Sequence, residues 1–227
     1  ALAALVRTCG RSPALRVRQT AALALVPLVS PARRPVVLID LATELGAATE
    51  HNHAHGLLLQ LRALVSHSTA HAILDGACIA SLVAALAPSL PRLALPCNTV
   101  RAAFAQLISA LAPHAPRDGL QPAAALVQRL AAEDEAAAAA AAASSVRRLP
   151  APDTAAWRAE LHRLNVQLRV LCGDAFGAES ALLRLLTDGA YEVRLVALVG
   201  VRSALGLPNA DIDDGIPVVR RAFAAPA

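Results

Sequence analysis

Three histidines lie close together in the segment Glu50-His51-Asn52-His53-Ala54-His55-Gly56. On a helix His51 and His55 share a face, and neutral imidazoles bind zinc. The sequence supplies no third ligand at suitable spacing. His67 and His71 repeat the four-residue spacing, but we expect them to straddle a Ser-Thr break between two helices. We therefore predict no metal site and no cofactor.

Two other interpretations fit the same segment. In the first, Asn52 caps a helix with its side-chain oxygen and leaves His51 in the preceding loop. In the second, Asn52, His55, Gly56 and Gln60 form a polar stripe beside an apolar helix face, because they recur at three- and four-residue steps. A glycine inside a helix costs about 1 kcal/mol relative to alanine. We expect another segment to pack closely at Gly56, and we favour structural support over partner recognition for this stripe.

Motifs typical of catalytic sites are missing from the sequence. It holds no nucleophile elbow, no P-loop, no G-x-G-x-x-G after a strand and no H-E-x-x-H. Asp211, Asp213 and Asp214 are followed by Gly215-Ile216-Pro217, which is typical of a turn and a helix cap. We predict that the chain is not an enzyme.

The four cysteines, Cys9, Cys78, Cys97 and Cys172, are widely separated and include no C-x-x-C pair. This spacing indicates neither a zinc site nor a disulfide framework. We expect buried free thiols in a reducing compartment, with a cytoplasmic location.

Apolar residues at three- and four-residue intervals predict a series of helices that prolines and glycines separate. Hydrophobic residues make up 56% of the 227 and aromatic residues only 2%, so leucine, valine and alanine must form the core. No uninterrupted apolar run reaches 18 residues, so we expect no membrane-spanning helix. The expected helices cover about 16–29, 35–45, 52–66, 70–87, 99–112, 120–131, 157–172, 181–186 and 191–205.

A Val-Arg pair opens three of these helices, at Val17-Arg18, Val100-Arg101 and Val193-Arg194. The outer pairs are 193 − 17 = 176 residues apart, or four units of about 44, within the range of about 40–47 for HEAT and armadillo repeats. We expect each Val to pack inward and each Arg to remain exposed or to reach carbonyl or acidic groups. The sequence thus predicts an all-α, armadillo/HEAT-like solenoid of stacked helical hairpins.

The predicted domains are helical repeats over 1–131, an alanine-rich insertion or linker over 132–152, and further helical repeats over 153–227. The linker holds Glu133-Asp134-Glu135 and eight alanines, Ala136 to Ala143. Alanine can form a helix but offers little side-chain area for packing.

The chain resembles the thyroid-adenoma-associated (THADA) family. The family segment N-x-x-H-G-x-x-L-Q matches at Asn52, His55, Gly56, Leu59 and Gln60. Upstream, residues 17–27 look like the family's V-R-x-x-A-A-x-A-L-V-P helix, and residues 96–104 and 191–194 look like later parts. The family's basic R-R-S-A-G element is missing. Family members are much longer, so the resemblance implies a partial chain.

The resemblance implies a scaffold that partners a separate methyltransferase and helps present the tRNA anticodon loop for ribose 2′-O-methylation. Arg18, Arg101 and Arg194 are the basic candidates for contact with the partner or with tRNA, beside the polar stripe. A net charge of +4 is too mild to indicate RNA binding by itself. The alternative is a HEAT-repeat scaffold for protein partners without an RNA role. A contiguous basic stripe would favour the first reading, and arginines paired with Asp or Glu would favour the second.

Overall fold

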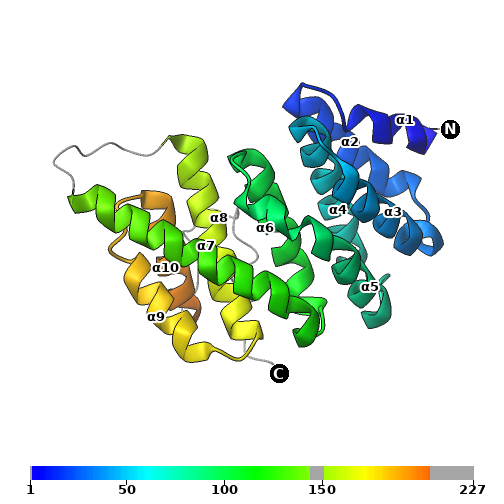
Figure 1. Ribbon diagram of the computed structural model, residues 1–227. Coiled ribbons are helices and arrows are strands. Elements are labelled where there is room, and N and C mark those ends of the chain that lie inside the picture. Colours follow the sequence, from blue (N-terminus) through cyan, green and yellow to red (C-terminus); the bar gives the residue numbers. More distant parts are fainter. Residues whose placement is uncertain (1, 144–150, 205–227) are drawn as a thin grey trace. The chain divides into compact units, whose positions relative to one another are not determined.

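The computed structural model describes residues 2–143 and 151–204, and within those ranges the regular elements are all helices (Figure 1). The α-helices are joined by tight turns and three 3₁₀ segments, each of which has proline at its first or second position. The elements are α1 (Leu2–Cys9), α2 (Leu15–Leu28), η1 (Pro31–Arg33), α3 (Arg34–Ala47), α4 (His51–Ala70), α5 (Gly76–Leu86), η2 (Ala87–Ala94), α6 (Asn98–Leu111), η3 (Ala112–His114), α7 (Arg117–Ala143), α8 (Pro152–Leu171), α9 (Ala175–Leu185) and α10 (Tyr191–Ala204).

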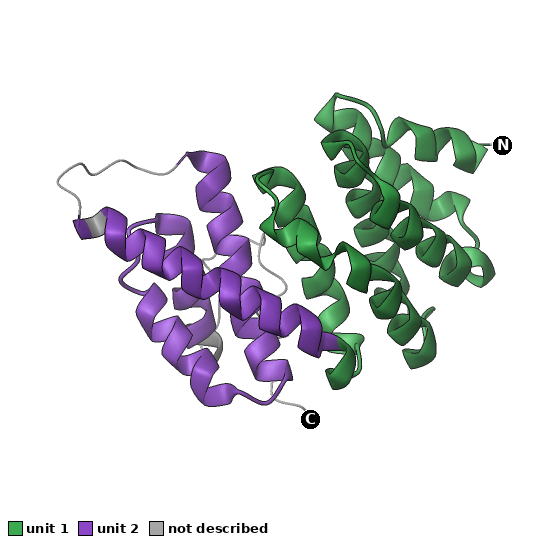
Figure 2. Ribbon diagram, viewed as in Figure 1, with its two compact units in different colours: residues 1–119 green, residues 120–227 purple. Residues whose placement is uncertain are grey.

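The chain forms two compact units, residues 1–119 and 120–227 (Figure 2). In unit 1, consecutive helices pair as α1/α2 and α3/α4, and α6 pairs with the 3₁₀ segment η2 that precedes it. Helices α2, α4 and α6 pack side by side, α3 packs against both α4 and α5, and η2 packs on α6. This is the arrangement of stacked hairpins in an armadillo/HEAT-like solenoid, so the predicted fold class is confirmed.

The core of unit 1 consists of aliphatic side chains with one large ring. Leu25, Leu41, Leu58 and Leu64 are fully buried, together with Phe104 of α6. Burial of each such side chain stabilises the fold by roughly 1.5–3 kcal/mol. The predicted leucine- and alanine-rich core is therefore the one observed, and the helices bury their apolar faces by stacking on one another.

In unit 2, helices α8, α9 and α10 pack against one another, and the part of α7 from Leu120 onward belongs to the same unit. Small residues such as Ala181 and Ala197 are fully buried where these helices meet, which allows their backbones to approach closely. This core contains Val166, Ala178, Ala181, Leu182, Leu185, Ala190, Val193 and Ala197.

The first part of the predicted linker over 132–152 is helical. Helix α7 continues through Ala143, and the units divide at Gly119 and Leu120 instead. The alanines are nevertheless mostly exposed, because a methyl group offers little area to pack, while their high helix propensity sustains the helix. Residues 144–150 and the Asp211, Asp213 and Asp214 cluster lie outside the described residues.

The helix expected over 70–87 corresponds to α5, which begins at Gly76 and not near residue 70. The Asp75 carboxylate caps α5 and accepts the Cys78 backbone N–H at 2.7 Å. Within the described residues, the segment Gly76–Ala94 has the length and apolar composition to cross a membrane, contrary to the sequence expectation. In the structure this segment breaks into α5 and η2, and Leu82 and Leu93 are buried against the rest of unit 1.

Candidate functional site

Gly56 of α4 lies against the turn that follows α1, as the sequence predicted for a close approach. A Cβ atom at Gly56 would lie 1.8 Å from the carbonyl oxygen of Gly10 and 2.6 Å from its carbonyl carbon. One helical turn further on, Gln60 donates from Nε2 to the carbonyl oxygen of Arg7 at 3.3 Å. Only glycine at position 56 lets the turn backbone reach the surface of α4.

Arg18 of α2 connects the same turn to α4. Its guanidinium donates to the carbonyl oxygens of Ser12 at 2.7 Å and Pro13 at 2.9 Å. It also donates to Asn52 Oδ1 at 3.0 Å and to His55 Nδ1 at 3.2 Å. Arg18 is only 6% exposed, so these four acceptors replace the water that its charge would otherwise bind. Arg18 therefore holds the α1–α2 turn and α4 together.

His55 is a neutral acceptor in this network. An arginine can only donate, so His55 Nδ1 must be unprotonated. Burial, together with the positive charges of Arg18 and Arg62, lowers the pKa of His55 from 6.5 to about 4. The imidazole is thus uncharged at neutral pH.

The helix-cap interpretation of Asn52 is wrong. Helix α4 begins at His51, and the capping position is Glu50, which makes no side-chain hydrogen bond to the helix. The Asn52 oxygen is engaged by Arg18 instead. The polar-stripe interpretation therefore describes the structure: Asn52, His55, Gly56 and Gln60, here termed the α4 polar face, receive the α1–α2 turn.

The repeated Val-Arg pairs have a common structural basis. Arg18 and Arg194 are each the fourth residue of their helix. Arg194 donates to the carbonyl oxygens of Asp188 at 2.7 Å and Gly189 at 3.1 Å, which precede it by six and five residues. Arg18 uses the same two offsets. In both hairpins the arginine satisfies carbonyls of the turn that leads into its helix.

Arg101, the fourth residue of α6, acts similarly by donating to the Leu93 carbonyl oxygen at 2.7 Å. The expectation that these arginines reach carbonyl groups is confirmed. The inward packing of the valines holds for Val100 and Val193, which are buried, but is wrong for Val17, which is 42% exposed. The main packing partners of α2 are α1 and α4.

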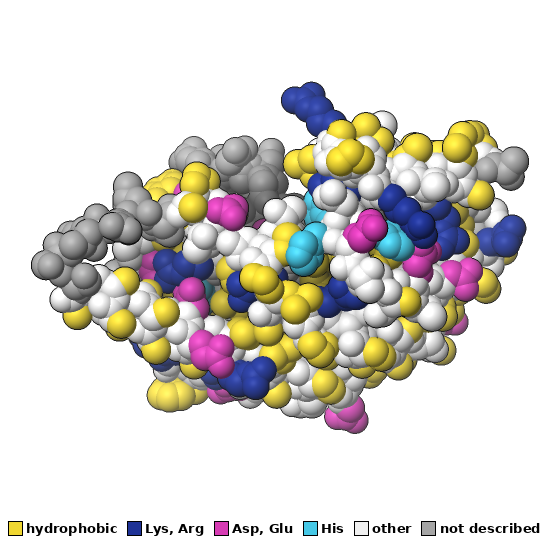
Figure 3. Space-filling model, turned by 45° about the horizontal axis from the view of Figure 1, so that its top comes forward, with side chains coloured by type: hydrophobic (Ala, Val, Ile, Leu, Met, Phe, Trp, Pro, Cys, Tyr) yellow, Lys and Arg dark blue, Asp and Glu magenta, His cyan; other side chains and the backbone are white. Residues whose placement is uncertain are grey.

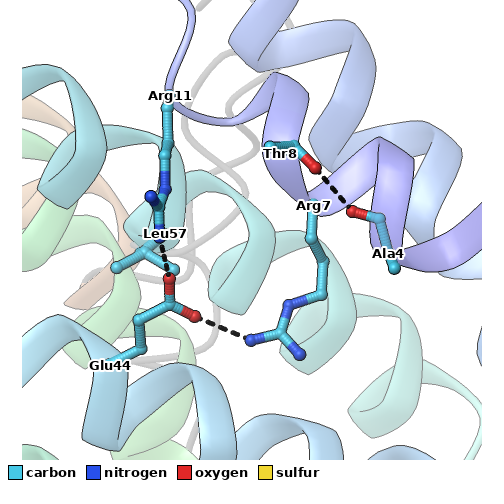
Figure 4. A pocket seen from close by; sticks show the side chains of 6 residues that line it. All are labelled: Ala4, Arg7, Thr8, Arg11, Glu44 and Leu57. Carbon is cyan, nitrogen blue, oxygen red and sulfur yellow. Dashed lines mark hydrogen bonds and ion pairs between the residues drawn. The ribbon is translucent and has the colours of Figure 1, made fainter.

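A cavity of about 290 Å³ lies beside the α4 polar face, between α1, α3 and α4 (Figure 4). Glu44 Oε2 accepts from Arg7 at 2.7 Å, and Oε1 accepts from Arg11 at 3.1 Å and lies 2.9 Å from His53 Nε2. Burial acts to raise the pKa of Glu44, but the hydrogen bonds from Arg11, His53 and Arg7 outweigh it and lower that pKa. The carboxylate is therefore ionised. The cavity, here termed the Arg7–Glu44 pocket, is lined by Ala4, Arg7, Thr8, Arg11, Glu44 and Leu57.

Most of the described arginines are bound within the protein. In Figure 3 the Arg side chains lie as separate groups, several of them beside Asp or Glu. Arg92 donates to the Leu45 carbonyl oxygen at 2.8 Å, and buried Arg34 donates to that of Val29 at 3.2 Å. Arginines bridged to Asp or Glu are Arg7, Arg11, Arg129, Arg158, Arg163, Arg169 and Arg184.

His67 and His71 do not straddle a helix break, because α4 continues to Ala70. Their ring centroids lie 4.3 Å apart, and His67 Nδ1 lies 2.8 Å from Arg34 NH1. A cation this close to the imidazole opposes metal binding. Across the part of the chain that the structure describes, no three His, Cys, Asp or Glu side chains converge as metal ligands.

The four cysteines are free thiols, but none is buried: Cys9 is exposed and the other three are half-buried, contrary to expectation.

Sequence reasoning missed a buried ionic network in unit 2. Arg158 is 8% exposed and contacts Asp134 Oδ2 at 2.8 Å and Asp188 Oδ2 at 2.7 Å. His162 Nε2 lies 2.9 Å from Asp134 Oδ2. Although burial raises the pKa of Asp134, hydrogen bonds from His162 and Arg158 lower it overall. Asp134 stands in an apparent solvated charge run, so no sequence signal separates it from its neighbours Glu133 and Glu135.

Comparison with known proteins gives one finding. Neither a curated protein nor a solved structure matches the chain. Residues 1–64 match the family model described as Trm732, C-terminal TPR repeats. This range covers α1 to α3 and most of α4, including the turn, Arg18 and the α4 polar face. The N-terminal 64 residues are therefore similar to the C-terminal repeats of Trm732, which supports a Trm732-like family for this part of the chain.

Proposed function

We propose that this chain is a non-catalytic scaffold that partners a 2′-O-ribose methyltransferase in methylation of the tRNA anticodon loop, in the cytoplasm. The observation that carries the proposal is the match of residues 1–64 to the Trm732 repeats. The resemblance of the same residues to the THADA family points to the same regulatory role. Stacked hairpins provide the extended surface that such a scaffold needs.

The hydrogen bonds of the candidate contact residues refine the part this chain plays. Arg18 is buried, and Arg101 and Arg194 donate to turn carbonyls, so none of the three presents a free guanidinium to a phosphate. The α4 polar face is likewise occupied by the chain's own turn. We therefore assign the methyl transfer and most RNA contact to the methyltransferase, and protein recognition to this chain.

Deletion of the gene in the source organism tests the proposal. We expect at least one anticodon-loop ribose to lose its 2′-O-methyl group while tRNA abundance is unchanged, as read by mass spectrometry of tRNA fragments. A tagged full-length protein should co-purify with a methyltransferase. Unchanged anticodon-loop methylation in the deletion strain would contradict the proposal.

The pairing of arginines favours a second candidate function, a scaffold for protein partners with no RNA role. At least seven of the described arginines bridge to Asp or Glu, which leaves few cations free to neutralise phosphates. Co-purification with proteins other than a methyltransferase, together with intact anticodon-loop methylation in the deletion strain, would support this function over the first.

A further inference from the structure

We infer that the Arg7–Glu44 pocket is a binding site for an acidic, leucine-containing peptide segment of a protein partner. The inference rests on the geometry of the pocket and does not depend on the proposed tRNA role. It concerns residues on the surface between α1, α3 and α4, outside the α4 polar face.

The pocket holds two guanidiniums and a single carboxylate. Arg7 and Arg11 each donate to a different oxygen of Glu44, and each uses only its NH2 group. A guanidinium carries five N–H donors. Within residues 2–143 and 151–204, neither side chain makes another hydrogen bond. Two positive charges against one negative charge leave a net charge of +1 and a set of donors that point into or beside the pocket (Figure 4).

Apolar surface accompanies these charges. Ala4 and Leu57 line the pocket; Ala4 is exposed, and Leu57 is 4% exposed, so an entering methyl or methylene group would contact mainly Ala4 and the accessible edge of Leu57. On the adjoining face of α1, Leu2 and Leu5 are 59% and 62% exposed. A ligand that joins a carboxylate to an aliphatic group matches both features, because Arg and carboxylate form charge-assisted hydrogen bonds.

RNA matches the pocket less well than a peptide does. Single-stranded RNA is held by aromatic stacking and by a basic groove that follows the backbone. None of the six lining residues is aromatic, and Ala4 and Leu57 suit an aliphatic side chain, which RNA lacks. A side-chain carboxylate on a partner protein is therefore the anionic group that fits.

The test uses fluorescence anisotropy with the whole 227-residue chain and a labelled peptide of sequence Leu-Asp-Asp-Leu-Leu-Asp. We expect the peptide to bind, the analogue with Asn in place of each Asp to fail, and binding to weaken in high salt. These comparisons need no protein variant, so they hold even where a substitution impairs folding. Binding of the neutral analogue as well as the acidic peptide, or no binding of the acidic peptide at millimolar concentration, would overturn the inference.

Substitutions then locate the site. Arg11→Gln should weaken peptide binding about three- to fivefold, the worth of one solvent-accessible ion pair. Glu44→Gln should strengthen binding, because it removes the carboxylate that competes with the ligand. Arg16→Gln is the matched control: Arg16 is exposed on α2, and its loss changes the net charge equally without touching the pocket.

A ten-nucleotide oligouridine competitor decides between the two ligand classes. We expect it to leave the bound peptide in place. Displacement of the peptide by oligouridine, with an oligouridine affinity that falls in the Arg11→Gln variant, would show that the pocket is a phosphate site and overturn the inference. Equal effects of Arg11→Gln and Arg16→Gln on peptide binding would overturn it as well.

Discussion

Replacing Gly56 with alanine should release the α1–α2 turn from α4. The new Cβ would lie 1.8 Å from the Gly10 carbonyl oxygen, whereas ordinary contact begins at 3.4 Å. The turn must therefore retreat by roughly 3.4 − 1.8 = 1.6 Å, since the clashing atoms belong to the backbone and cannot rotate away. That shift also lengthens the bond from Gln60 to the Arg7 carbonyl, already 3.3 Å long.

Three contributions set the size of the effect. Overpacking against a backbone costs about 1–3 kcal/mol. Loss of the Gln60 hydrogen bond costs about 1 kcal/mol. The higher helix propensity of alanine offsets about 1 kcal/mol of this. We expect the free energy of unfolding to fall by about 1–3 kcal/mol.

The assay is chemical denaturation followed by circular dichroism, with hydrogen exchange to locate the change. Gly46→Ala is the matched control, because Gly46 is also helical, and a Cβ there would meet only the Ser89 hydroxyl at 3.8 Å. We expect the control to be neutral or slightly stabilising. If Gly56→Ala were as stable as Gly46→Ala and left exchange in the α1–α2 turn unchanged, the close approach of Gly10 to Gly56 would be refuted.

Three further predictions follow from the buried polar groups. Arg18→Met should lower the free energy of unfolding by about 2–4 kcal/mol, because it strands four acceptors, whereas Arg16→Met on the same helix should have little effect in the same denaturation assay. The pKa of His55 is lower in the folded state, about 4 against its ordinary 6.5, so the folded protein takes up its proton later on acidification and stability should fall between pH 6.5 and about 4; His55→Gln should remove this part of the pH dependence of unfolding. Asp134→Asn should cost roughly 3 kcal/mol by leaving a buried arginine without one partner, whereas Glu133→Gln, its exposed neighbour, should cost only about 0.3 kcal/mol; equal effects in thermal denaturation would contradict the network.

The internal glycine and the polar stripe of α4 show which features of the site could be predicted from the sequence. An internal glycine in a strong helical pattern predicted a close backbone approach at position 56, and the structure contains one. The same pattern could not identify Gly10 as the approaching residue, because the two are 46 positions apart and no local rule connects them. The four-residue polar stripe was likewise visible in the sequence, whereas its acceptance of Arg18 was not.

The contacts of the charged side chains could not be predicted from the sequence. Glu133, Asp134 and Glu135 look alike in the chain, yet only Asp134 takes part in the buried network with Arg158. For arginines the sequence left open whether Arg18, Arg101 and Arg194 stay exposed or reach carbonyl groups, and the structure shows each of them donating to a backbone carbonyl five to eight residues earlier in the chain.

The amino-acid sequence alone determined most of the helices and the aliphatic core, because helix periodicity, proline and glycine act over a few residues and need no distant partner. Tertiary structure alone decided which polar side chains are structural and which stay available for a ligand, because a hydrogen bond or ion pair requires two groups to meet within about 3 Å. In the described part of this chain, hydrogen bonds formed on folding occupy the α4 polar face and leave donors free at Arg7 and Arg11.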